Sequence, residues 1–190
     1  MSDSLNITRE QALELLSTHV KSDNLRKHCI ATEAIMRVLA EELGEDKDLW
    51  GLAGLLHDLD YELTMDSPQE HGKKTAELLA SFNLPEEVIQ AIMRHNAEAL
   101  NLTRETTLDF ALTAAETITG LIVAATLVHP EKKIEKLQPQ SVKKRMKSKD
   151  FARNVNREHI MLCERIGIDP MRFIELSIEA MRKISGVLGL

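Results

Sequence analysis

The chain has 190 residues, of which 43% are hydrophobic, 28% charged and 3% aromatic, and its formal charge is −6 at pH 7. This composition excludes a disordered chain, and the length suits one domain with a substantial core. The negative charge argues against general nucleic-acid binding and against attachment to an anionic membrane. Because strands favour aromatic and β-branched residues, a core of mainly Leu, Ile, Ala, Val and Met favours helices.

The predicted elements follow one another as amphipathic helices with recognisable start and stop signals. Thr8 begins a capping box with Gln11, Gly44 ends the second helix, and Pro85 lies in the first turn of the fifth. The polar stretch 60–69 predicts a loop. Helices are expected at about 8–19, 22–43, 47–57, 71–82, 83–95, 106–128, 157–166 and 170–187. The sequence shows no strand alternation, glycine-rich phosphate loop or repeat, so it predicts an all-α fold.

The longest apolar segment, 108–128, contains only two charged residues, Asp109 and Glu116. Its length would suit a membrane span, but a carboxylate near the middle is costly in lipid. We therefore expect a long buried central helix in a bundle. Asp109 lies near the helix start, where the helix dipole stabilises a carboxylate. Glu116 has no such support and no Lys or Arg in its own helix, so it needs a cation from elsewhere.

The N-terminal residues carry neither a basic nor an apolar segment, so we expect no signal peptide and a cytoplasmic location. The two cysteines, Cys29 and Cys163, stand alone inside helical patterns and form no CxxC motif. They are therefore expected to be reduced, buried thiols rather than a disulfide or a zinc knuckle.

Histidines recur along the predicted helices and close to their ends. His28 shares the apolar face of its helix, His57-Asp58 ends an apolar run, and His71 and His95 lie close to predicted helix ends. Inward-facing histidines and carboxylates on neighbouring helices are how bundles build metal sites. A metal would also neutralise Glu116.

Each of these features alone has a simpler interpretation, which stays open. A lone histidine such as His28 is more often an ordinary core residue, and Asp58 could cap a loop. Glu116 could pair with an arginine from another helix, such as Arg153 or Arg157. The ordered combination favours the metal site.

The order His28, Leu55-Leu-His-Asp58, His71-Gly72, His95 and then an acid in an apolar helix resembles the HD superfamily of metal-dependent phosphohydrolases. The resemblance covers about residues 23–128. It implies one HD-type helical domain over 1–190, with its core at about 23–128 and a helical extension at 129–190. Within the superfamily, the pattern is similar to the symmetrical diadenosine-tetraphosphate hydrolases. Two positions depart from that pattern, because Glu116 replaces the usual Asp and Tyr61 replaces a frequent Lys.

By this resemblance, His28, His57, Asp58 and Glu116 would hold a first metal ion. A second ion would be held by His71 and His95, with Asp58 as the bridge. His57 and Asp58 would form the catalytic centre, where a metal-activated water attacks phosphorus. Mixed imidazole and carboxylate donors favour iron or manganese for these one or two divalent ions, and zinc, nickel and magnesium are also compatible.

The expected substrate is a nucleotide or another small phosphorylated metabolite. Candidate phosphate contacts are Lys73 and Arg94, beside predicted ligands, and Lys143 and Lys144 in the basic stretch 143–149. Each of these could equally be a solvated helix face. Two other functions stay open: an oxygenase with iron on the same scaffold, which would resemble inositol oxygenase, and a non-catalytic binding module. A homo-oligomer is compatible with the sequence.

Overall fold

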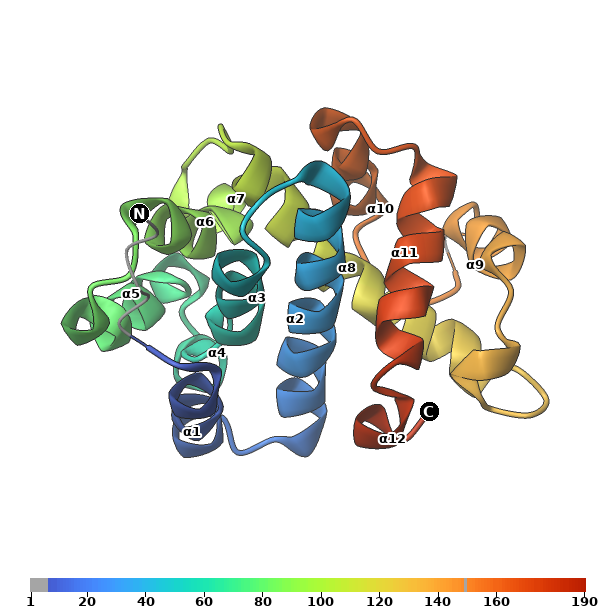
Figure 1. Ribbon diagram of the computed structural model, residues 1–190, viewed down its shortest axis with the longest axis horizontal. Helices are drawn as coiled ribbons and strands as arrows, with labels where there is room; N and C mark the ends of the chain where they lie inside the picture. Colours follow the sequence, from blue (N-terminus) through green and yellow to red (C-terminus); the bar gives the residue numbers. More distant parts are fainter. Residues whose placement is uncertain (1–6, 149) are drawn as a thin grey trace.

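The computed structural model describes residues 7–148 and 150–190, and over these residues the chain forms helices and no strand. The all-α prediction is therefore confirmed (Figure 1). The N-terminal residues 1–6, used for the signal-peptide prediction, and Lys149 of the basic stretch lie outside the described residues. The elements are α1 (Arg9–His19), α2 (Asp23–Leu43), α3 (Lys47–Leu56), α4 (Tyr61–Thr64), η1 (Pro68–Glu70), α5 (Lys73–Leu79), η2 (Ala80–Phe82), α6 (Glu86–His95), α7 (Ala97–Leu100), α8 (Thr107–Leu127), η3 (Ile134–Lys136), α9 (Pro139–Met146), α10 (Arg157–Ile160), η4 (Met161–Ile166), α11 (Pro170–Arg182) and α12 (Ser185–Leu188).

Local capping explains most of the long helix boundaries. Thr8 and Gln11 form the predicted capping box at α1, and the Asp46 carboxylate accepts from the Asp48 and Leu49 amides at the start of α3. Gly44 ends α2 with a φ of 76°, in the left-handed region that glycine tolerates best. These signals need only neighbouring residues, so the sequence predicts them well.

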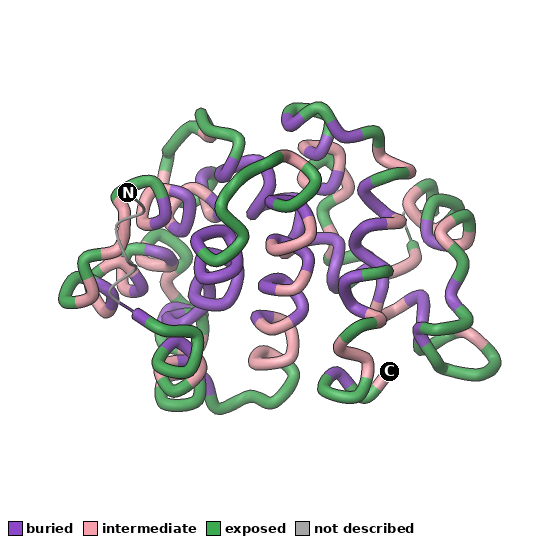
Figure 2. Tube along the Cα trace, viewed as in Figure 1, coloured by how far each residue is buried: buried purple, intermediate pink, exposed green. Residues whose placement is uncertain are grey.

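Helix α8 is the centre of the bundle. It runs behind α2 and α11 in Figure 1 and packs against α2, α3, α6, α9, α10 and α11. Among the described helices, it alone is long and apolar enough to cross a membrane by length and composition, but 72% of its most apolar stretch is buried inside the protein. Figure 2 shows buried backbone along α3 and along the inward sides of α2 and α11. This burial confirms the predicted central helix.

Several segments differ from the sequence prediction. The expected loop 60–69 contains α4 and η1, and the helix expected from His71 begins at Lys73. The expected last helix ends at Arg182 and is followed by the separate turn of α12. The basic stretch lies partly on α9, a helix that the sequence did not predict, which starts at Pro139 and packs on α8 and α11.

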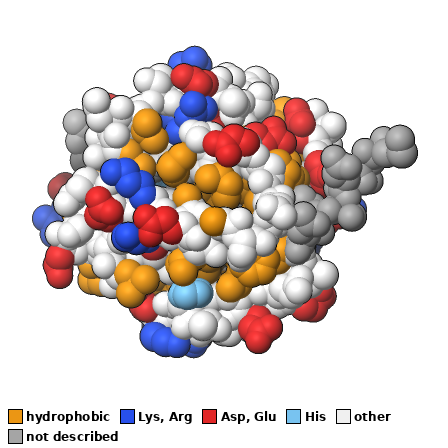
Figure 3. Space-filling view, turned by 90° about the vertical axis from the view of Figure 1, so that its left-hand side faces the viewer, with side chains coloured by type: hydrophobic (Ala, Val, Ile, Leu, Met, Phe, Trp, Pro, Cys, Tyr) orange, Lys and Arg blue, Asp and Glu red, His pale blue; other side chains and the backbone are white. Residues whose placement is uncertain are grey.

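The surface mixes charges of both signs. Figure 3 views the side of the molecule that carries α1 and α5, and there Lys, Arg, Asp and Glu side chains are interspersed with hydrophobic ones. Both cysteines, Cys29 and Cys163, are buried and unpaired, as predicted. Burial raises the pKa of the Cys163 thiol to about 12, which keeps it protonated at neutral pH.

Candidate metal centre

Four histidines and one aspartate from separate elements meet at one end of α3. His28 comes from the first half of α2, His57 and Asp58 follow α3, His71 precedes α5, and His95 ends α6. We call these five residues the histidine cluster. His57, Asp58 and His95 are buried, whereas His28 and His71 are partly exposed.

Gly54 lets α3 approach α2 closely enough to bring His57 beside His28. A Cβ atom at Gly54 would lie 2.9 Å from the Glu33 backbone nitrogen and 3.0 Å from its Cα, distances that side-chain atoms rarely adopt. Any larger residue would push the two helices apart. The Gly54 carbonyl also accepts a hydrogen bond from His57 Nδ1 at 2.8 Å, so the same position orients the imidazole.

Gly72 has the corresponding role for His71 and His95. Its φ is 91°, and a Cβ there would lie 3.2 Å from both the Ile92 carbonyl oxygen and Met93 Cα on α6. The turn can therefore lie directly against α6. This contact places His71 Nε2 at 2.9 Å from His95 Nε2.

The Asp58 carboxylate lies between two pairs of imidazoles. Its Oδ2 atom is 3.7 Å from His28 Nε2 and 3.5 Å from His57 Nε2, and those two nitrogens are 3.2 Å apart. Its Oδ1 atom is 3.3 Å from His71 Nε2 and 3.5 Å from His95 Nε2. Each side gives a group of ligand atoms that all lie within 4.8 Å of one another. One carboxylate therefore joins two three-residue groups.

Each imidazole is oriented by a hydrogen bond at Nδ1. His57 and His95 donate to the carbonyls of Gly54 and Ile92, and His71 donates to Asp60 Oδ1 at 2.7 Å. The Thr119 hydroxyl donates to the Glu116 carbonyl at 2.6 Å, so it accepts from His28 Nδ1 at 2.8 Å. With the proton held on Nδ1, each imidazole in its neutral form directs the Nε2 lone pair to the centre of the cluster.

The charges in the cluster agree with this assignment for His57 and depart from it for His71. Burial lowers the pKa of His57 to about 3, so this imidazole is neutral. The surrounding histidines overcome the effect of burial on Asp58 and hold its pKa well below the ordinary value. Burial opposes protonation of His71 too, but hydrogen bonds to Asp58 and Asp60 raise its pKa to about 9. A proton on His71 thus supplies the positive charge that the facing lone pairs require.

The residues present fit a divalent metal on each side of Asp58. Ligand atoms about 2.1 Å from an ion in tetrahedral or octahedral geometry lie about 3.0–3.4 Å apart. The Nε2 and carboxylate atoms on each side of Asp58 are separated by 2.9–3.7 Å. Converging imine lone pairs repel one another without a cation, so the donor chemistry also suits a metal.

Glu116 lies beside the cluster but belongs to neither group of mutually close ligand atoms. It is partly buried on α8, and the Thr117 hydroxyl donates to its Oε1. Burial raises its pKa, an effect that the nearby His28 opposes. The alternative pairing with Arg157 does not occur, because that guanidinium donates to backbone carbonyls such as those of Ala152 and Val155. Whether Glu116 binds a metal remains a prediction.

Asp109 has the structural role that its position near the start of α8 predicts. It is fully buried, and its Oδ2 atom accepts from the Glu105 and Thr106 amides at 2.8 and 3.0 Å. Arg94 Nη1 donates to the same oxygen at 3.0 Å, and Arg94 Nη2 donates to Glu105 at 2.7 Å. The guanidinium of Arg94 therefore has two carboxylate partners, which argues against Arg94 as a phosphate contact.

The other predicted phosphate contacts lie on the surface. Lys73 is exposed in the first turn of α5, two residues after His71, with Glu70 at 3.9 Å. Lys143 and Lys144 are exposed on α9, which lies across the molecule from α5 and α6 in Figure 1. This separation argues against contact of Lys143 or Lys144 with a phosphate held near His71 and His95.

The sequence interpretation missed two residues that orient histidines. Asp60 was assigned only to a loop, yet it is buried and accepts from His71 Nδ1, the Gly72 amide and the Thr75 amide. Thr119 on α8 accepts from His28 Nδ1 and so orients that imidazole. The sequence does show an acid two residues after Asp58. However, an acid in a short loop can be recognised as a histidine partner only when its burial is known.

Comparison with known proteins finds relatives that this chain matches over only part of their length. Ribonuclease Y from Clostridium perfringens (strain SM101 / Type A) is 27% identical over 164 residues, which are 85% of this chain and 32% of that protein. Ribonuclease Y from Sulfurovum sp. (strain NBC37-1) is 30% identical over 138 residues, 71% of this chain and 26% of that protein. The chain thus spans about a third of these relatives or less. No solved structure matches significantly.

The relatives reported above are not named as diadenosine-tetraphosphate hydrolases, so that finer resemblance stays a prediction. The broader resemblance has direct support. The family described as "HD domain" matches residues 25–161, which include the whole histidine cluster and Glu116. The match covers well over half of the chain, and the chain belongs to the HD domain family.

Proposed function

We propose that this protein is a phosphohydrolase that works with one or two divalent metal ions held by the histidine cluster. The observation that carries the proposal is the position of Asp58, with one carboxylate oxygen toward His28 and His57 and the other toward His71 and His95. A carboxylate in that position can bridge two ions. HD-domain membership supports the same chemistry.

The protein's own side chains would hold and orient the reacting groups. His57 and His95 are fixed by backbone carbonyls, so each keeps its Nε2 lone pair toward the centre. Divalent ions bound there would lower the pKa of a bound water and neutralise charge on phosphoryl oxygens. The mixed imidazole and carboxylate donors favour iron or manganese. Glu116, on the wall of an adjoining depression of about 370 Å³, would complete the first metal's ligands from the substrate side.

The proposed substrate is a small phosphorylated metabolite or nucleotide. The adjoining depression is lined by His28, Glu116, Asn154, Asn156 and His159, which suits a compact polar group better than a long polyanion. The formal charge of −6 also disfavours general nucleic-acid binding.

A second candidate is the hydrolysis of an RNA phosphodiester bond. It is favoured by the name Ribonuclease Y of the relatives, although the chain matches no more than about a third of their length. The resemblance to diadenosine-tetraphosphate hydrolases favours a phosphoanhydride bond instead. A substrate panel should therefore contain mononucleotides, diadenosine tetraphosphate, phosphate monoesters and short RNA oligonucleotides.

The test combines metal analysis with that panel. Protein purified without chelator should contain one to two transition-metal ions per chain and hydrolyse at least one class of phosphate bond. Asp58→Asn should abolish the activity and lower the metal content, whereas Asp66→Asn, the same change at an exposed position, should alter neither. A metal-free protein that cannot be loaded, or wild-type activity in Asp58→Asn, would refute the proposal. Oxygen uptake with a polyol would instead favour the oxygenase, and a metal-loaded but inert protein would favour the binding module.

A further inference from the structure

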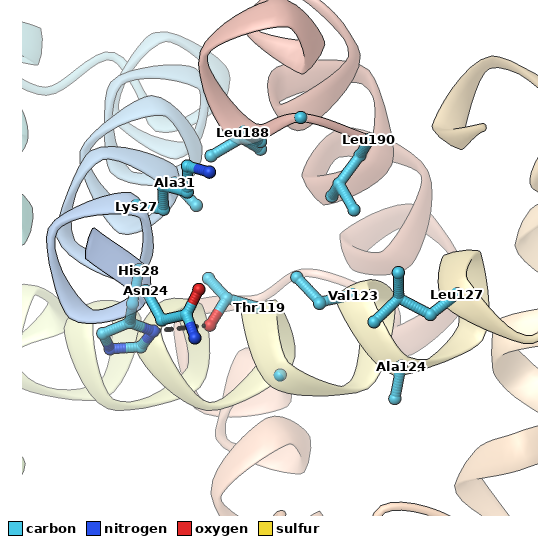
Figure 4. Close-up of a pocket in the computed structure, with 12 residues that line it drawn as sticks. Asn24, Lys27, His28, Ala31, Thr119, Val123, Ala124, Leu127, Leu188 and Leu190 are labelled. Carbon is cyan, nitrogen blue, oxygen red and sulfur yellow. Dashed lines mark hydrogen bonds between the residues drawn. The ribbon is translucent and has the colours of Figure 1, made fainter. Parts of the chain in front are cut away.

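A cavity of about 520 Å³ lies beside the histidine cluster, between α2, α8 and the C-terminal residues that follow α11 (Figure 4). This volume is in the range of sites that bind small molecules. Among the predicted ligands of the cluster, only His28 contributes to its wall. The aliphatic part of the wall consists of Ala31, Val123, Ala124, Leu127, Leu188 and Leu190.

The chemistry of this wall disfavours a nucleobase. Among the described residues, no Phe, Tyr or Trp side chain lines it, and the one imidazole, that of His28, is already bonded to Thr119 and lies beside His57. Its polar groups gather at one side, as Figure 4 shows for Asn24, His28 and Thr119. His28 and Thr119 are hydrogen-bonded to each other, and Lys27 pairs with Asp23 at 3.0 Å. A base placed against the aliphatic side would leave its polar atoms without partners, whereas an alkyl chain has none to satisfy.

The cavity adjoins the polar depression that contains Glu116. Three residues, His28, Thr119 and Gly120, line both spaces. Gly120 is exposed at the junction, and a Cβ atom there would meet only the Val155 Cγ2 atom, at 3.2 Å. The missing side chain leaves the surface of α8 open between the two spaces. A single ligand could therefore place a polar head near Glu116 and His28 and run its chain over Gly120.

We propose that the cavity binds the aliphatic portion of the substrate, so that the substrate class is a phosphate ester with an alkyl or acyl chain. The inference rests on the proposed phosphohydrolase function and narrows it. The phosphate lies on the side of Glu116, and the chain packs between α2 and α8 against Val123, Ala124 and Leu188. The aliphatic wall, its volume and its continuity with the metal side carry the proposal.

The first experiment measures binding to metal-loaded protein by calorimetry, with inorganic phosphate, butyl phosphate, hexyl phosphate and octyl phosphate as probes. Each added methylene that enters the cavity should tighten binding about fourfold. Ala124→Leu fills the cavity with a residue that helices accept readily, so the fold should survive. This variant should remove the dependence on chain length while leaving the affinity for inorganic phosphate unchanged. Ala80→Leu, the same change at an exposed position of η2, is the matched control.

The second experiment measures hydrolysis of the same alkyl phosphates, so the two proposals can fail separately. A chain-length dependence in binding that Ala124→Leu abolishes supports the cavity even if no ester is hydrolysed. Hydrolysis with kcat/KM independent of chain length leaves the phosphohydrolase standing and overturns the cavity proposal. Nucleotide binding that Ala124→Leu weakens, with alkyl phosphates unaffected, overturns the aliphatic assignment. A concentration-dependent dimer that Ala124→Leu dissociates would show that a second copy of the chain occupies the cavity instead, and would also overturn it.

Discussion

Two acids seven residues apart on α8 should have separable roles, which the substitutions Asp109→Asn and Glu116→Gln can test. Asp109 is fully buried and accepts three hydrogen bonds, from Arg94 and from the Glu105 and Thr106 amides. Glu116 is partly buried beside His28, with the Thr117 hydroxyl as its hydrogen-bond donor. The first should stabilise the start of the helix, and the second should serve the metal centre.

The expected loss of stability in Asp109→Asn follows from these contacts. Breaking a buried ion pair costs about 3–5 kcal/mol, and losing a charge at a helix N-terminus costs about 0.3–1 kcal/mol. The asparagine oxygen can still accept, and Arg94 keeps Glu105 at 2.7 Å, so part of this cost is avoided. We expect the free energy of unfolding to fall by about 2–4 kcal/mol, with the metal content unchanged.

Glu116→Gln should have the opposite effect, a loss of metal and activity without a loss of stability. Because burial raises the pKa of Glu116, its ionised form is less favourable in the folded protein than in the unfolded chain. Above the folded pKa this disfavours folding, so a neutral Gln should leave the metal-free protein equally stable or slightly more stable. The same change should lower metal content and remove most activity.

Urea denaturation of metal-free protein and elemental analysis of loaded protein measure the two effects. Circular dichroism at low denaturant serves as the control that both variants are folded. If Asp109→Asn lost the metal at unchanged stability while Glu116→Gln kept it, the assignment of the two acids would be reversed. If Glu116→Gln kept both metal and activity, the ligand set would end with the histidine cluster.

Three further predictions concern the surroundings of the cluster. Asp60→Asn should weaken metal binding about 10- to 100-fold, because His71 would no longer be held by a carboxylate, while the helical content should be kept. Competition with a chelating dye measures the affinity, and an unchanged affinity would contradict the positioning role of Asp60. Removing the metal with a chelator should lower the free energy of unfolding by about 3 kcal/mol, compared with protein at a free metal concentration about 100 times Kd. An unchanged midpoint in thermal melts would count against a bound ion. Replacing Lys143 and Lys144 by Ala should leave KM for a small phosphate ester unchanged, because neither lysine lines the depression beside Glu116. An increase in KM would show that these lysines reach the substrate.

Local signals allowed much of the fold to be predicted from the sequence. The start of α8 is a capping box formed by Thr106 and Asp109, and its apolar length leaves few alternatives to a buried helix. The boundaries of α1 and α2 depend in the same way on Thr8 and Gly44. Helix α9 was missed because its sequence is strongly basic, and the burial of Val142 against the bundle stabilises it through tertiary contacts.

The same distinction between local signals and tertiary contacts applies to the candidate site. The order of the histidines indicated which residues meet, but not which partners orient them. Asp60 looks like any loop acid until the turn at Gly72 supplies two backbone amides to it. Arg94 looked like a free cation beside His95, yet it is held by Asp109 from α8. In both cases the partner comes from a different element, and only the folded structure shows which one.

Three of the four histidines, His28, His57 and His95, are oriented in two different ways, which follow from where each lies relative to its helix. His57 directly follows α3 and His95 ends α6, and each donates from Nδ1 to the carbonyl three residues earlier, that of Gly54 or Ile92. Carbonyls in the last turn have no further helical amide to bind, so a terminal histidine can take one and point its Nε2 away from the helix. His28 lies within α2, where the carbonyls are already bonded, and it needs Thr119 from α8 instead. A histidine at the end of a helix is therefore oriented by a carbonyl of that same helix, whereas a histidine inside a helix needs a partner from a helix packed against it.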